Sequence, residues 1–219
     1  MFDALRERRI TVYRHSPRPA DERTHVVDFH AAAAAKAIGA SYAPGAVPRL
    51  ASPPDWGNES SAPLLRSRSG ASAGWRCGRW VVAPGSGSIG KNWPLAHFVS
   101  AAEALTTAGA NVAWLLGPAE VERGTRELLP VGATVWQQLS ITRVAALVAA
   151  STGYLGNDSG TSHLAAALGV PTVALFGPTE AAVWAPRGPA VTVITADALE
   201  EIAVDAVVDA CRQLQVSDE

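Results

Sequence analysis

Two short polar segments of the sequence combine residue types that bind phosphate. The first follows an apolar run at residues 80–83 and reads Pro-Gly-Ser-Gly-Ser-Ile-Gly-Lys-Asn-Trp-Pro from Pro84 to Pro94. Its glycines let backbone N–H groups approach an anion closely, its serine hydroxyls can donate hydrogen bonds, and Lys91 supplies a positive charge. Lys36 and Lys91 are the two lysines among 18 basic residues, and the others are arginines. A lysine in this loop therefore favours a specific role over an arbitrary surface charge. We expect the loop to contact phosphate; the simpler interpretation is a flexible strand-to-helix turn.

The same loop comes close to the nucleoside-triphosphate pattern G-x-x-x-x-G-K-[ST], with Gly85, Gly90 and Lys91 in place. Asn92 stands where that pattern has a hydroxyl for Mg²⁺, and Pro94 disfavours helical geometry at the residue before it. The helix is therefore expected to begin after Lys91, whereas the lysine of a true P-loop lies at the helix start. A P-loop phosphotransferase is accordingly a distant alternative.

The second polar segment runs from Gly156 to Leu164 and reads Gly-Asn-Asp-Ser-Gly-Thr-Ser-His-Leu. A strand is expected to end here, and a helix to open near Gly160. The free N–H groups and the dipole of a helix start favour an anion, and His163 in the first turn can donate to the same anion. The alternative is simple helix capping by Asp158 or Ser159, with His163 as a partly buried polar side chain.

From Trp80 onward, apolar runs of strand length alternate with segments of helical period. Strands are expected at residues 80–83, 111–116, 134–137, 153–156, 172–176 and 191–194. Helices are expected at residues 95–105 with a stop at Gly109, at 141–150, at 161–168 with a stop at Gly169, and along a stripe formed by Leu199, Ile202, Ala206, Val207 and Leu214. This alternation predicts an α/β, doubly wound, Rossmann-like parallel sheet. In the usual strand order 3-2-1-4-5-6, the two polar segments face each other across one crevice.

Other residues give weaker indications. Glu120 follows the second strand, where an acidic residue can bind ribose hydroxyls, although a solvated carboxylate at a helix start is an equal alternative. His25, Asp28 and His30 open a helix expected at residues 26–38 and have metal-ligating side chains. Nothing elsewhere in the sequence completes a metal site, so we expect a solvated helix start there.

Composition narrows the class of protein. The chain has 219 residues, of which 48% are hydrophobic, enough to bury a core and to exclude wholesale disorder. Its net charge of -2 lacks the basic excess of nucleic-acid binders. No apolar stretch reaches the roughly 18 residues of a membrane span, and residues 1–10 are charged where a signal peptide would be apolar. With Cys77 and Cys211 far apart, we expect a reduced, cytoplasmic protein without disulfides.

From about Trp80 to the end, the sequence resembles the nucleotide-sugar-binding half of the bacterial lipopolysaccharide heptosyltransferase family, glycosyltransferase family nine. The resemblance rests on the two polar segments, on the continuation of the second through Gly169, on residues 171–179, and on Trp184-x-Pro186-Arg187-Gly188. It covers well over half the chain. It implies the two-domain GT-B fold, with the donor in the C-terminal domain and the acceptor site and catalytic carboxylate in the N-terminal domain.

The resemblance also implies roles for individual residues. Six would meet the donor diphosphate from two sides: Ser86 and Lys91 from one, and Asp158, Ser159, Gly160 and His163 from the other. Glu120, with Glu122 as the near alternative, would bind the ribose, and Leu139 would lie against the base. A lysine and a helix N-terminus can stabilise the departing diphosphate, so neither a metal nor another cofactor is implied.

The implied reaction transfers a sugar, a heptose from ADP-heptose, to a lipopolysaccharide-core acceptor with inversion at the anomeric carbon. The implied partners are therefore the nucleotide sugar and this acceptor, with no nucleic acid and at most peripheral contact with the cytoplasmic face of the inner membrane.

By the same resemblance, residues 1–43 are a remnant of the N-terminal acceptor domain, 44–76 a linker rich in Pro, Ser and Gly, and 77–219 the donor-binding domain. A complete enzyme of this type has two domains and roughly 300 residues or more. The general base is expected in the missing part of the first domain, so no catalytic residue is named. A non-catalytic nucleotide-sugar-binding fragment is the alternative.

Overall fold

The computed structural model describes residues 23–37, 41, 43–45, 47, 49–50 and 78–216. Residues 1–22 of the expected domain remnant at 1–43, most of the expected linker at 44–76, and Cys77 therefore lie outside the described residues. The chain divides into two compact units, Met1–Ala46 with Ala182–Trp184, and Val47–Ala181 with Ala185–Glu219. In the described part, no helix has the length and apolar character needed to cross a bilayer.

The described part of the smaller unit contains helix α2, Val26–Ala37, which matches the helix expected at 26–38 up to the last described residue. Its start is held by two hydrogen bonds, one from within the start itself and one from Gly45. The Val27 N–H donates to Nδ1 of His25 at 3.2 Å, and the Gly45 N–H donates to the Asp28 carboxylate at 2.8 Å. Asp28 also lies in the first turn, where a negative charge complements the helix dipole.

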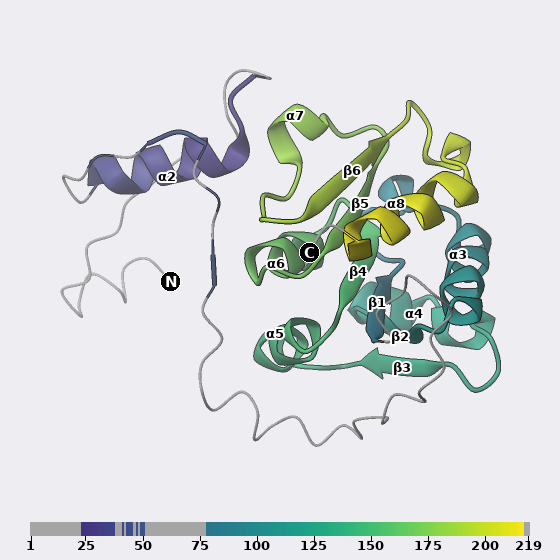
Figure 1. The fold of residues 1–219 in the computed structure, drawn as a ribbon. Coiled ribbons are helices and arrows are strands. Elements are labelled where there is room, and N and C mark those ends of the chain that lie inside the picture. The colour runs from purple at the N-terminus through teal and green to yellow at the C-terminus, as the bar shows by residue number, and fades with distance from the viewer. Residues whose placement is uncertain are drawn as a thin grey trace. The chain divides into compact units, whose positions relative to one another are not determined.

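The larger unit is built on a six-stranded parallel sheet in the order β3-β2-β1-β4-β5-β6 (Figure 1). The strands are β1 Arg79–Ala83, β2 Asn111–Leu116, β3 Thr134–Gln137, β4 Gly153–Asn157, β5 Thr172–Phe176 and β6 Val191–Thr195. Every residue of β4 and β5 is buried, as expected for central strands covered on both faces. The predicted fold class and strand order are confirmed.

Helices lie between successive strands and after β6. They are η2 Ile89–Lys91, α3 Leu95–Thr107, α4 Pro118–Glu122, η3 Thr125–Leu128, α5 Ile141–Ala149, α6 Gly160–Ala167, α7 Ala181–Trp184, η4 Leu199–Glu201 and α8 Val204–Val216. The expected stops after α3 and α6 are confirmed, because Gly109 and Gly169 adopt φ values of 102° and 79° that favour glycine.

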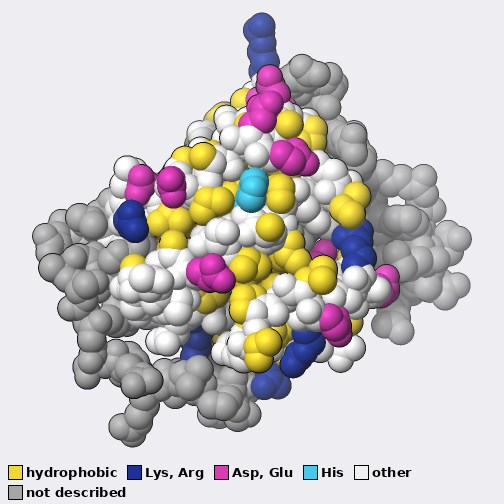
Figure 2. Space-filling view, turned by 90° about the vertical axis from the view of Figure 1, so that its right-hand side faces the viewer, with side chains coloured by type: hydrophobic (Ala, Val, Ile, Leu, Met, Phe, Trp, Pro, Cys, Tyr) yellow, Lys and Arg dark blue, Asp and Glu magenta, His cyan; other side chains and the backbone are white. Residues whose placement is uncertain are grey.

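Two clusters of buried side chains cover the two faces of the sheet. Neighbouring residues of β1 alternate between them, with Trp80 packing on the side of α3 and α8, and Val81 on the side of α5 and α6. Figure 1 shows the two helix pairs on opposite sides of the sheet. Figure 2 looks onto the α3 side, where hydrophobic side chains gather near the middle with charged side chains around them. The sheet is thus a rigid base for the loops at its edges.

The start predicted for the final helix is wrong. Leu199 lies in the short helix η4, and Ile202 is extended with ψ of 113°, so that α8 begins only at Val204. The physical reason is a tertiary hydrogen bond, because the indole Nε1 of Trp93 donates to the Ile202 carbonyl at 3.1 Å. That carbonyl faces the loop after β1.

Candidate functional site

The loop after β1 is ordered by its own serines. The Ser86 hydroxyl donates to the Ser88 carbonyl at 2.7 Å and accepts from the Ser88 N–H at 3.2 Å. Ser86 is buried, and the chain continues into η2 before α3 begins at Leu95. Lys91 therefore ends a short 3-10 turn and precedes the α-helix, as expected, which differs from the lysine position of a P-loop.

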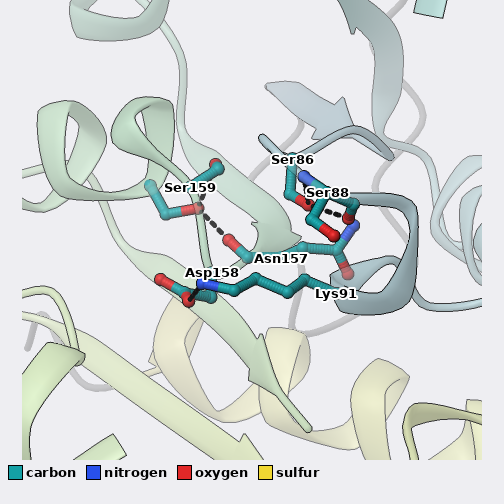
Figure 3. Close-up of polar contacts among 7 residues, drawn as sticks. Ser86, Ser88, Lys91, Asn157, Asp158 and Ser159 are labelled. Carbon is teal, nitrogen blue, oxygen red and sulfur yellow. Dashed lines mark hydrogen bonds and ion pairs between the residues drawn. The ribbon is translucent and has the colours of Figure 1, made fainter. Parts of the chain in front are cut away.

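The two polar segments meet at the carboxyl edge of the sheet, as predicted. The Lys91 ammonium donates to the Asp158 carboxylate at 2.8 Å, across 67 residues of sequence. Figure 3 shows the Lys91 side chain extended from its loop to Asp158, with Asn157 lying between the two segments. The side chains of Lys91 and Asp158 are 38% and 12% exposed, so the lysine remains accessible from solvent. The convergence that the site hypothesis requires is present.

A second bridge joins the same segments through Asn157, which is fully buried. Its Oδ1 accepts the Trp93 N–H at 3.0 Å, and its Nδ2 donates to the Pro84 carbonyl at 2.8 Å. Sequence reasoning quoted Asn157 within the second segment but gave it no role. Its position directly before Asp158, at the end of a buried strand, could have indicated a role in the site.

The start of α6 is not capped in the simple way that the alternative interpretation required. The Ser159 side chain makes no capping bond to the helix backbone, and the carboxylate of Asp158 is paired with Lys91. Helix geometry gives the N–H groups of Gly160 and Thr161 no carbonyl partner inside α6. Ser159 occupies the N-cap position of α6, but neither its side chain nor that of Asp158 makes a capping bond, and the helix start is suited to an anion.

A hydroxyl network beneath this helix start holds its first turn. The Tyr154 hydroxyl lies 2.7 Å from the Thr161 hydroxyl, the Ser159 hydroxyl lies 3.1 Å from those of Thr161 and Ser162, and the Ser162 hydroxyl donates to the Asn157 carbonyl at 2.6 Å. Burial raises the pKa of Tyr154, so its hydroxyl keeps its proton well above neutral pH. Sequence reasoning missed Tyr154, because an aromatic residue inside a strand reads as core.

A cavity of about 630 Å³ opens beside the helix start. Five of the residues assigned to the site from sequence lie on its wall: Ser86, Glu120, Leu139, Ser159 and Gly160. Its other lining is largely apolar and includes Leu115, Leu116 and Val144. Lys91, Asp158 and His163 are not among the lining residues; the first two form the ion pair described above, and His163 is half-buried in the first turn of α6. A separate cavity of about 600 Å³ lies at the amino ends of β1 and β2, and none of the predicted site residues lines it.

Glu120 is a buried carboxylate in the cavity wall. Its Oε2 accepts the Gly117 N–H at 3.1 Å, and its Oε1 lies 3.6 Å from Nη1 of Arg123. Oε1 is buried and has no hydrogen-bond partner. Glu122 is exposed on the same short helix, and of the two acids it is Glu120 that lines the cavity. A buried oxygen with spare hydrogen-bonding capacity is suited to a ligand hydroxyl.

Gly85 lies directly against this carboxylate. A Cβ at position 85 would overlap the carboxyl group of Glu120, whereas a Cβ at Gly87 would have no atom within 4 Å. The loop after β1 and the loop after β2 therefore pack together around Glu120. Among the described residues, no group of three His, Cys, Asp or Glu side chains is placed to hold a metal ion.

Comparison with known proteins agrees with this architecture. The model of a family described as glycosyltransferase family 9 (heptosyltransferase) matches residues 4–207. Lipopolysaccharide heptosyltransferase 1 of Pseudomonas aeruginosa is 39% identical over 103 residues, which cover 45% of this chain and 28% of that protein.

Two solved structures from Escherichia coli are also similar. ADP-heptose lps heptosyltransferase II is 25% identical with a TM-score of 0.58, over 67% of this chain and 48% of that one. A heptosyltransferase solved with ADP shares the fold at 22% identity and a TM-score of 0.66, over 92% of this chain and 59% of that one. The match thus covers less than a third of the curated relative and about half of the solved ones.

Proposed function

The chain belongs to glycosyltransferase family 9, and we propose that it binds the nucleotide-sugar donor of a glycosyl transfer reaction. Its sheet matches part of the GT-B heptosyltransferase structures. The observation that carries the proposal is the convergence of the Lys91 ammonium and the first amides of α6 beside a cavity of about 630 Å³. This volume lies within the range of about 300–1,000 Å³ usual for small-molecule sites.

The diphosphate lies between the 85–92 loop and the start of α6. Ser86 and Lys91 contact it from the loop, and the N–H groups at Ser159 and Gly160 contact it from the helix, with His163 as an additional donor. Asp158 acts through Lys91, because its carboxylate, two residues before α6, accepts the ammonium at 2.8 Å. These groups bring positive charge and N–H donors to one place, which is what a pyrophosphate requires.

The nucleoside lies in the cavity. The buried Oε1 of Glu120 accepts a hydrogen bond from a ribose hydroxyl, and Leu139 packs against the base. Leu139 lies next to Gln138, which has a φ of 56° and directs the chain from β3 along the cavity wall. The apolar lining suits the flat faces of a nucleobase.

In the transfer step, the diphosphate leaves as negative charge develops on it. The Lys91 ammonium and the α6 dipole stabilise that charge without a metal ion. The proposed donor is ADP-heptose, the acceptor is a lipopolysaccharide core, and the anomeric carbon is inverted. The base that activates the acceptor hydroxyl belongs to the N-terminal acceptor domain. Residues 1–43 are assigned to that domain, and the base is proposed for the part of it outside these residues.

Calorimetry of ADP binding, with EDTA and separately with Mg²⁺, tests the donor site. We expect equal affinity in both, whereas tight binding only with Mg²⁺ would favour the P-loop alternative. Incubation with ADP-heptose and a lipid A–Kdo acceptor then tests transfer. Release of ADP supports the enzyme, and donor binding without release of ADP supports the non-catalytic nucleotide-sugar binder. An absence of ADP binding under both conditions rejects the proposed function.

A further inference from the structure

We propose that Asn157 is a positioning residue that holds the 85–92 loop at both of its ends against the start of α6. This inference rests on the proposed function, because it assigns Asn157 the task of setting the gap in which the diphosphate is received. Asn157 touches no ligand in this assignment. It acts through the loop and through the helix that follows it.

The side chain of Asn157 contacts the loop at the two points where it enters and leaves. Pro84 directly precedes the loop and Trp93 directly follows it. Since the Pro84 carbonyl can only accept and the Trp93 N–H can only donate, these partners fix the orientation of the amide, with Nδ2 toward Pro84 and Oδ1 toward Trp93. One planar amide thus closes the loop at its base.

The backbone of Asn157 is bound on the opposite side. It pairs with Leu175 of β5 in the sheet, and its carbonyl accepts the Ser162 hydroxyl at 2.6 Å, in the first turn of α6. The next residue, Asp158, is the partner of Lys91. Asn157 therefore connects the loop, the sheet and the helix that together form the proposed diphosphate site.

A merely space-filling role does not explain this residue. Burying an amide costs free energy unless both its donor and its acceptor are paired, so an apolar residue of similar size is the simpler way to fill a core position. Both side-chain hydrogen bonds of Asn157 join it to the two ends of the loop. Without them, the loop between residues 84 and 93 gains conformational freedom, which must be lost again when a ligand binds.

The test compares Asn157→Ala, Asn157→Asp and a matched control, Thr172→Val, in the full chain. Thr172 is fully buried, and its hydroxyl donates to Val170 at 2.7 Å at the beginning of β5, the strand end away from the site. Amide hydrogen exchange without nucleotide measures the freedom of residues 85–93. Calorimetry with ADP measures the consequence for binding.

We expect Asn157→Ala to speed exchange in residues 85–93 selectively and to weaken ADP binding about tenfold. Thr172→Val should change neither, although it also loses a buried hydrogen bond. If the unsubstituted chain binds ADP and Asn157→Ala binds it equally well with unchanged exchange, the positioning role is overturned while the proposed function stands.

Asn157→Asp gives a readout that a packing role would not produce. An ionised carboxylate can accept from Trp93 but repels the Pro84 carbonyl, whereas a protonated carboxyl can donate to that carbonyl and restore both bonds. Relative to the unsubstituted chain at each pH, its ADP affinity should therefore recover from about pH 8 to about pH 5. Lys91 and Asp158 form an ion pair next to this position and are present in both chains, so the ratio removes the effect of their own ionisation but not their coupling to the new carboxyl group.

The two proposals fail in different ways. Should the unsubstituted chain bind no ADP, the proposed function falls, and hydrogen exchange alone decides the positioning role. Faster exchange confined to residues 85–93 in Asn157→Ala supports the role, and exchange unchanged or raised throughout the sheet overturns it. If Asn157→Ala does not fold, the pH dependence of loop protection in Asn157→Asp, corrected for the intrinsic exchange rate and compared with the unsubstituted chain, decides in its place. Relative protection that does not change with pH is the contrary result.

Discussion

The ammonium of Lys91 lies 2.8 Å from the carboxylate of Asp158, so the cation of the loop has a partner within the chain. Since the lysine is more than a third exposed, the pair contributes only about 0–1 kcal/mol to stability. A doubly or triply charged diphosphate is a stronger partner for an ammonium than one carboxylate. The ion pair therefore keeps the lysine in place at little cost to ligand binding.

Replacing Lys91 by Ala should weaken binding of both ADP and inorganic pyrophosphate by about 1–3 kcal/mol, because a charge-assisted contact is lost. Asp158→Ala should also weaken binding, since the lysine loses the group that holds it. Calorimetry measures both. The matched control is Arg212→Ala, which breaks an exposed ion pair with Asp209 on α8 and should leave both affinities unchanged. Unchanged affinity in both the Lys91 and Asp158 variants would remove the diphosphate assignment.

Glu120→Gln should weaken ADP binding by about 1–3 kcal/mol and leave pyrophosphate binding unaltered, because only ADP carries a ribose for the buried Oε1. Gln keeps an oxygen that can accept the Gly117 N–H, so the fold should be retained. Glu122→Gln on the exposed side of α4 is the control and should match the unsubstituted chain. Equal losses for ADP and pyrophosphate in Glu120→Gln would contradict a ribose contact.

Gly85→Ala should lower both the free energy of unfolding and the ADP affinity, since the new methyl group overlaps the Glu120 carboxyl group. Overpacking in a core costs about 1–3 kcal/mol, and the value here should lie at the lower end because the overlapped carboxyl group is the far end of a flexible side chain. Gly87→Ala, two residues away in open space, should change the unfolding free energy by only a few tenths of that amount. Urea unfolding followed by circular dichroism measures both; similar values for the two variants would show that the loop is not packed on Glu120.

Tyr154→Phe should lower the free energy of unfolding at neutral pH by about 1 kcal/mol, because the hydroxyl network at the start of α6 loses a member. Burial raises the pKa of Tyr154 above its usual value of 10.0. The folded chain thus keeps this proton after the unfolded chain has lost it. The stability contributed by the neutral group is complete below about pH 10 and is lost as pH rises toward the folded pKa.

The two stability curves should therefore converge above about pH 10, by up to 1.4 kcal/mol per pH unit. Burial also raises the pKa of the Cys211 thiol, but that residue is the same in both chains and its effect cancels in the difference. Urea unfolding at a series of alkaline pH values provides the measurement. Parallel curves across that range would show that Tyr154 ionises no later in the folded chain than in the unfolded one.

The class of fold, the strand order and the meeting of the two polar segments were predictable from sequence. Continuous apolar runs separated by helices leave few arrangements, and right-handed crossovers between parallel strands restrict them further. Once β1 and β4 are neighbours, the segments after them must share an edge of the sheet. Gly109 and Gly169 marked helix ends because glycine alone adopts their positive φ without strain.

The errors arose where a tertiary contact overrides a local pattern. The apolar spacing from Leu199 to Leu214 is helical throughout, yet the Trp93 indole bonds to the Ile202 carbonyl and the chain is extended there. Asp158 and Ser159 have the side chains of helix caps, but Asp158 pairs with Lys91 and the Ser159 hydroxyl bonds to neighbouring hydroxyls. The partners of Asp158 and of the Ile202 carbonyl are distant in sequence, so no local spacing reveals them, whereas those of Ser159 lie two and three residues away.

The hydrogen bond from Trp93 to Ile202 has a consequence for engineering this chain. It ties the exit of the 85–92 loop to the segment that leads into the C-terminal helix, more than a hundred positions later. Fusion partners, truncations or crystal-engineering changes that loosen the stretch around Ile202 should release the tryptophan and, under the proposed function, weaken nucleotide binding. The segment around Ile202 therefore helps to hold the 85–92 loop in place through Trp93.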